Sequence, residues 1–115
     1  MAQSNAFVFS TDGKPLPELV RAWLDARRFP VSVVDSADAL MAAALRSRPR
    51  VVIIDARVHP VAALNGCQRL KADSFTGIVP VVMCTRDEDI GFAAAFDAGA
   101  DEVLRLLFWW PLSGK

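Results

Sequence analysis

Short apolar segments recur along this chain of 115 residues, and each gives way to a turn or to polar residues. Four of them are rich in valine, isoleucine or phenylalanine and are only four or five residues long, which is typical of strands buried on both faces of a sheet. A fifth and more polar segment follows near the end of the chain. The predicted strands are residues 6–10, 31–34, 51–54, 80–84 and 102–105.

The segments between these strands have the spacing of amphipathic helices. Residues 16–28 carry an apolar side chain every three or four positions, which predicts a helix with Trp23 in the core. Ser36 can cap a second helix, and Pro49 ends it. The predicted helices are residues 16–28, 37–47, 64–72 and 87–98.

Strands that alternate with helices over short connections predict a single α/β domain. Right-handed crossovers between successive strands give a parallel sheet with helices on both faces. With 53% apolar and 23% charged residues, the composition is that of a globular protein. We find no internal repeat, low-complexity segment or linker.

Charge and hydropathy exclude several classes of function. Thirteen basic and thirteen acidic side chains cancel, so no overall field favours nucleic acid or an anionic membrane. The apolar runs are far shorter than the roughly 20 residues that span a bilayer, and no signal peptide opens the sequence, so a cytoplasmic location is expected. Cys67 and Cys84 lack the spacing of a metal or redox pair and are expected to be buried free thiols.

Polar residues stand where three of the predicted strands end. Thr11 and Asp12 follow the first strand, Asp55 follows the third, and Thr85 follows the fourth. In an open parallel sheet, ligands bind beyond the carboxyl ends of the strands, at the point where the winding direction reverses. We therefore expect two carboxylates and two hydroxyls to converge on one rim of the sheet.

These segments read FVFSTD, VVIIDARVHP, PVVMCT and GADEVLRL, and in residues 7–105 the chain resembles response-regulator receiver domains. The resemblance implies a flavodoxin-like, doubly wound sheet of five parallel strands in the order 2-1-3-4-5. It implies a role in two-component phosphorelay signalling rather than enzymatic turnover. The expected partner is a histidine kinase or a phosphotransfer protein.

The same resemblance assigns roles to individual residues. Asp55 matches the aspartate that accepts the phosphoryl group, and Thr85 matches the hydroxyl residue that contacts this group and relays the switch. Asp12, Asp55 and the backbone carbonyl of Arg57 match the ligands of Mg²⁺, a hard cation that prefers oxygen.

Several positions depart from the receiver pattern. Thr11 replaces the first member of the acidic pair, so Mg²⁺ is expected to bind weakly. Leu106 stands where receivers carry a lysine. Arg105 can replace that lysine only if a bulge or an early strand end turns it round, because successive strand side chains point to opposite faces. Val103 replaces the aromatic switch residue. A phosphorylation-independent pseudo-receiver, acting as an interaction or dimerisation module, is therefore the alternative.

The end of the sequence differs as well. Residues 1–106 are expected to form the receiver-like domain, and the apolar tail 107–115 takes the place of the usual fifth helix. Loss of that helix should uncover apolar surface along the first and third strands. Phe108, Trp109 and Trp110 could cover it as a plug or bind a second copy in a homodimer. The tail could also mark the point at which a longer protein was cut.

Two enzymatic alternatives fit the sequence less well. A flavodoxin-like nucleotide binder would need a longer and less acidic phosphate loop than residues 10–13 offer. An aspartate-based phosphatase would need a second carboxylate two residues after Asp55, where Arg57 stands. His59 is expected at the surface, and the acidic run 87–89 is expected at a helix start rather than in a metal site.

Overall fold

The computed structural model describes residues 6–10, 18–57, 59–85 and 92–105. Strands and helices alternate along the whole of this part of the chain. In order they are β1 (Ala6–Phe9), α1 (Glu18–Ala26), β2 (Val31–Val34), α2 (Ala37–Ser47), β3 (Val51–Asp55), α3 (Pro60–Ala72), β4 (Val81–Thr85), α4 (Phe92–Asp97) and β5 (Glu102–Arg105).

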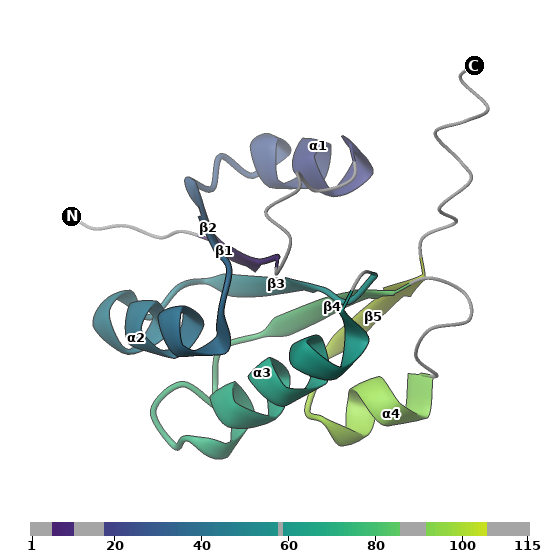
Figure 1. The fold of residues 1–115 in the computed structure, drawn as a ribbon. Helices are drawn as coiled ribbons and strands as arrows, with labels where there is room; N and C mark the ends of the chain where they lie inside the picture. Colours follow the sequence, from purple (N-terminus) through teal and green to yellow (C-terminus); the bar gives the residue numbers. More distant parts are fainter. Residues whose placement is uncertain (1–5, 11–17, 58, 86–91, 106–115) are drawn as a thin grey trace.

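The five strands form one parallel sheet in the order β2-β1-β3-β4-β5. Figure 1 shows α1 on one face of this sheet and α2, α3 and α4 on the other. The fold class and the strand order predicted from the sequence are confirmed. Since β1 pairs with both β2 and β3, the winding direction reverses between β1 and β3, and the carboxyl end of β3 lies at this reversal.

Two apolar clusters hold the helices to the sheet. The larger cluster joins the sheet to α2, α3 and α4, and it includes Phe9, Leu40, Ile54, Leu70 and Met83. The smaller cluster packs Val20 and Leu24 of α1 against β1 and β3. Because alternate strand residues serve opposite clusters, β1 and β3 are buried along their whole length, as their apolar sequences predict.

The described residues of β1 and β3 show none of the apolar exposure that loss of a fifth helix was expected to cause. Val8 and Ile53, which face α1, are each 1% exposed. The exposed apolar side chains of the sheet lie instead on its edge strands, at Val31 and Val33 of β2 and Leu104 of β5. The edge strands have a neighbour on one side only, so α1 covers the centre of the sheet and leaves its margins open.

Trp23 corrects a second expectation, since it lies at the surface of α1 rather than in the core. Its side chain is 42% exposed. The guanidinium of Arg27 stacks 4.2 Å from the ring centroid, and Phe29 meets the ring edge-on at 6.5 Å. Cation–π and edge contacts of this kind stabilise an indole that is only half covered.

Helix boundaries follow local capping chemistry. The Ser36 hydroxyl accepts a hydrogen bond from the backbone N–H of Ala39 at 3.0 Å, so α2 begins at the predicted position. Helix α3 begins at Pro60, earlier than the apolar periodicity predicts, because proline in the first turn needs no N–H partner. His59 precedes this helix and is exposed, as expected.

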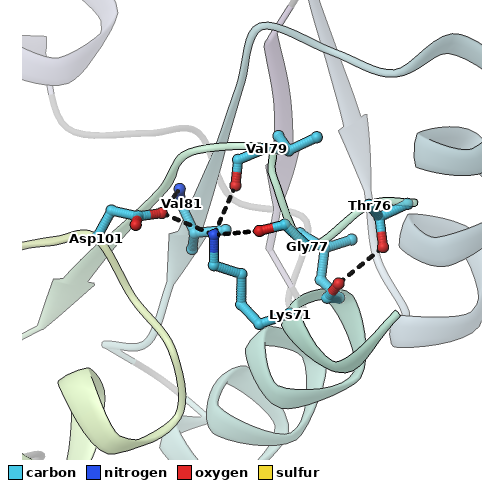
Figure 2. Close-up of polar contacts among 7 residues, drawn as sticks. Lys71, Thr76, Gly77, Val79, Val81 and Asp101 are labelled. Carbon is cyan, nitrogen blue, oxygen red and sulfur yellow. Dashed lines mark hydrogen bonds and ion pairs between the residues drawn. The ribbon is translucent and has the colours of Figure 1, made fainter. Parts of the chain in front are cut away.

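A partly buried polar network ties the α3–β4 connection to the start of β5 (Figure 2). The Lys71 ammonium donates to the carbonyl oxygens of Gly77 and Val79 at 2.8 and 2.9 Å and to the Asp101 carboxylate at 2.9 Å. The same carboxylate oxygen of Asp101 accepts a hydrogen bond from the Val81 N–H. One lysine thus fixes the loop that sets the register of β4.

Some predicted features lie outside the described residues. These are Thr11, Asp12, the acidic run 87–89, Leu106 and the tail 107–115. Within the described residues, no helix is both long and apolar enough to cross a membrane.

Candidate functional site

Asp55 is the last residue of β3 and lies at the reversal of the sheet. Its side chain is almost completely buried, and its backbone pairs with Cys84 of β4. A carboxylate that ends a buried apolar strand is costly unless it is paired, because ionised groups lose their hydration on burial. The groups that pair with the Asp55 carboxylate therefore determine which ligands and reactions the site allows.

Arg57 supplies these partners. The backbone N–H of Arg57 donates to Asp55 Oδ1 at 3.0 Å, which forms a local turn at the strand end. This turn directs the arginine side chain back to the same carboxylate. Nε donates to Oδ1 at 2.9 Å and Nη2 donates to Oδ2 at 2.8 Å, so the guanidinium engages both oxygens.

Thr85 ends β4, the strand next to β3 in the sheet. Its side chain is fully buried, and its hydroxyl has no hydrogen-bond partner among the described residues. Nearly all buried polar groups in proteins are paired, so a lone hydroxyl needs an explanation. A ligand oxygen arriving at this rim of the sheet would satisfy it.

Cys84 directly precedes Thr85 in β4, and it pairs with Asp55 across the β3–β4 ladder. The pKa of its thiol is raised to about 12, mainly by burial and also by the negative charge of Asp55, while Arg57 opposes the rise. Cys67 is also buried, and burial raises its pKa to about 11. Both cysteines are free and buried, as predicted.

Comparison with protein-family models and with curated proteins found no match. Comparison with solved structures found extensive similarity. A proposed response regulator from Chloroflexus aurantiacus has 21% identity, covers 90% of this chain and 85% of its own, and gives a TM-score of 0.72.

Two further structures give similar values. The receiver domain of the sensor histidine kinase PA1611 from Pseudomonas aeruginosa has 18% identity over 90% of this chain and 85% of its own, with a TM-score of 0.69. That domain holds a magnesium ion in its active-site cleft. The chemotaxis protein CheY4 from Vibrio cholerae has 15% identity over 90% and 87%, with a TM-score of 0.67.

The chain has the receiver-domain fold. Within this fold, Asp55 and Thr85 occupy the carboxyl ends of adjacent strands, as the sequence predicts. Asp12 lies outside the described residues, so its distance from Asp55 stays a prediction. β5 pairs residue for residue with β4 up to Thr85 and Arg105, so the described strand contains no bulge that would reorient Arg105.

The PA1611 receiver domain holds its magnesium ion in the active-site cleft, and carboxylate oxygens such as those of Asp55 are ligands that divalent cations prefer. The described residues include no cluster of three or more potential metal ligands. Both oxygens of Asp55 are already bonded to the Arg57 guanidinium. The arrangement therefore fits Mg²⁺ only after the guanidinium has moved away.

Sequence reasoning missed the side chain of Arg57, for which only the backbone carbonyl was assigned a role. An arginine two residues after a strand-end aspartate is the signal that could have found it, because that spacing allows a turn with a bidentate return contact.

Proposed function

We propose that this chain is a receiver module in two-component phosphorelay signalling and that Asp55 accepts the phosphoryl group. The observation that carries the proposal is the placement of a buried carboxylate and an unpartnered buried hydroxyl, Asp55 and Thr85, at neighbouring strand ends of a receiver-type sheet. The partner is a histidine kinase or a phosphotransfer protein, and the proposed location is the cytoplasm.

The chemistry is a transfer between two side chains. A carboxylate oxygen of Asp55 attacks the phosphorus of a phosphohistidine on the partner, the P–N bond breaks as the O–P bond forms, and the imidazole leaves with the bonding pair and takes up a proton. The chain accepts and holds the group, so its role is that of a phosphoryl acceptor rather than an enzyme acting on a small substrate.

The residues of this chain have separate parts in that transfer. Arg57 must release one oxygen of Asp55 before attack, and its guanidinium can then pair with the charged phosphoryl oxygens. The Thr85 hydroxyl donates to a phosphoryl oxygen and gains the partner that it lacks. Mg²⁺, when bound by Asp12, Asp55 and the Arg57 carbonyl, would neutralise phosphoryl charge, and we expect its binding to be weak.

The Arg57 contact also favours a second candidate function. A carboxylate whose two oxygens are held by an internal cation can be a purely structural group. In that case the chain is a pseudo-receiver that binds proteins without phosphorylation, and the tail 107–115 could join two copies in a homodimer. Sedimentation at micromolar concentration should then show a dimer, and a monomer would exclude the dimer.

Incubation with acetyl phosphate and Mg²⁺ followed by intact-mass analysis under acidic conditions tests the main proposal. We expect a mass increase of one phosphoryl group in the wild type and none in Asp55→Asn. The matched control Asp38→Asn removes an exposed carboxylate that pairs with Arg69 elsewhere on the surface, and it should still be modified. An unmodified wild type would leave the pseudo-receiver function.

A further inference from the structure

Among the described residues, Arg57 is the positively charged group that contacts Asp55, the proposed acceptor. Its side chain is 23% exposed and that of Asp55 is 5% exposed, so the pair lies in a partly buried place where water screens it poorly. The planar guanidinium meets the carboxylate in the two-point geometry that a lysine cannot reproduce.

We propose that the Arg57 guanidinium is the resident cation of this site and a gate on Asp55. It donates to both carboxylate oxygens, and it must leave before a divalent cation or a phosphoryl donor can reach the same oxygens. The inference rests on the proposed function only in taking Asp55 as the acidic centre of the site.

Three features of the contact support a gate rather than a fixed structural pair. The arginine belongs to the connection after β3 and not to a helix or strand, so its side chain can withdraw without breaking a backbone ladder. The backbone N–H bond from Arg57 to Asp55 Oδ1 can persist when the guanidinium withdraws. The partly exposed position of the guanidinium gives it a route to water.

A gate at Arg57 predicts how strongly the affinity for Mg²⁺ should change when the guanidinium is removed. In the wild type, Mg²⁺ must displace two charge-assisted hydrogen bonds before it contacts Asp55. Each such bond contributes enough net free energy that its removal should tighten the apparent affinity for Mg²⁺ by about tenfold or more. The same loss should leave the apo protein less stable, because Asp55 becomes a buried charge without its partner.

The experiment titrates Mg²⁺ alone into the wild type, Arg57→Gln and Arg57→Met, with affinity read from amide chemical shifts. The glutamine variant keeps a hydrogen-bond donor and guards against loss of folding in the methionine variant. Arg69→Met is the matched control, because Arg69 makes an ion pair of similar length with Asp38 on the exposed surface. Asp55→Asn combined with Arg57→Gln shows whether the metal binds at Asp55.

We expect Mg²⁺ to bind Arg57→Gln about tenfold more tightly than the wild type or Arg69→Met, and to lose this gain when Asp55 is replaced. Equal affinity in the wild type and both Arg57 variants would overturn the gate, and so would failure of every variant to bind Mg²⁺. No phosphoryl donor is present, so the result is independent of the proposed function. If Arg57→Gln gains affinity for Mg²⁺ but acetyl phosphate leaves the wild type unmodified in the mass measurement, the gate stands and the receiver activity does not.

Discussion

Arg57 and Asp55, two residues apart in the sequence, form a two-point ion pair in which Nε and Nη2 donate to separate carboxylate oxygens at 2.9 and 2.8 Å. The pair places a positive charge at the end of β3. In the sequence, Leu106 follows directly after β5, at the position where the resemblance to receivers predicts a lysine. Within the described residues, the connection after β3 therefore supplies a positive charge directly to Asp55.

The lone hydroxyl of Thr85 leads to a prediction about stability. Thr85→Val keeps the shape of the side chain and removes a buried oxygen that has no partner in the described residues. We expect the free energy of unfolding to rise by about 1 kcal/mol, since an unpaired buried hydroxyl costs about 1–3 kcal/mol. Urea unfolding measures this, with Thr76→Val as the control, because the Thr76 hydroxyl donates to Leu70 at 2.7 Å and its loss should destabilise. A destabilised Thr85→Val would show that the hydroxyl is already paired.

The Lys71 network predicts a larger effect than its single charge suggests. Lys71→Met should lower the free energy of unfolding by about 1–3 kcal/mol, because the carbonyls of Gly77 and Val79 and the Asp101 carboxylate all lose a charged donor. Arg69→Met removes an ion pair at the exposed surface and should cost only about 0–1 kcal/mol. Equal losses in the two variants, measured by urea unfolding, would contradict the structural role of Lys71.

Gly66 permits close packing between α3 and β1. A methyl group at this position would lie 2.7 Å from Cε2 of the buried Phe9 ring. Overpacking costs about 1–3 kcal/mol, which exceeds the gain of about 1 kcal/mol in helix propensity, so Gly66→Ala should destabilise the protein. In a Phe9→Leu background the same substitution should cost less, because the shorter side chain leaves room. An identical loss in both backgrounds, determined by a double-mutant cycle, would exclude this contact as the cause.

The buried thiols predict alkaline destabilisation. Burial raises the pKa of Cys84 from 9.0 to about 12 and that of Cys67 from 9.0 to about 11. Below pH 9.0, both thiols keep their protons in the folded and in the unfolded state. Between pH 9.0 and the raised pKa values, only the unfolded state loses these protons, so the free energy of unfolding falls as the pH rises through this window. The fall should be shallower in Cys84→Ala, measured by urea unfolding across the window. A slope unchanged by the substitution would mean that the thiol ionises equally in both states.

Much of the fold could be predicted because it depends on local patterns. The apolar runs that became β2, β3 and β5 lie within one residue of their predicted bounds, and α2 matches its cap at Ser36. Alternation of strands and helices leaves few parallel topologies, and the resemblance to receivers selected the correct strand order.

The site was predictable only in part. The strand-end positions of Asp55 and Thr85 follow from where apolar runs stop, which the sequence displays. The return of the Arg57 side chain depends on the turn after β3, and the exposure of Trp23 depends on how α1 lies over the sheet. The spacing of Arg57 from Asp55 permits the first contact without requiring it, and the exposure of Trp23 is a tertiary property that helical spacing does not encode.

The most direct test of the account uses beryllofluoride, a stable mimic of a phosphoryl group on aspartate. Amide spectra of the wild type should shift at Asp55, Ala56, Cys84 and Thr85 when beryllofluoride and Mg²⁺ are added together, and Asp55→Asn should show no such shifts. Spectra that stay unchanged in the wild type, or that change equally in Asp55→Asn, would contradict the assignment of Asp55 as the phosphoryl acceptor.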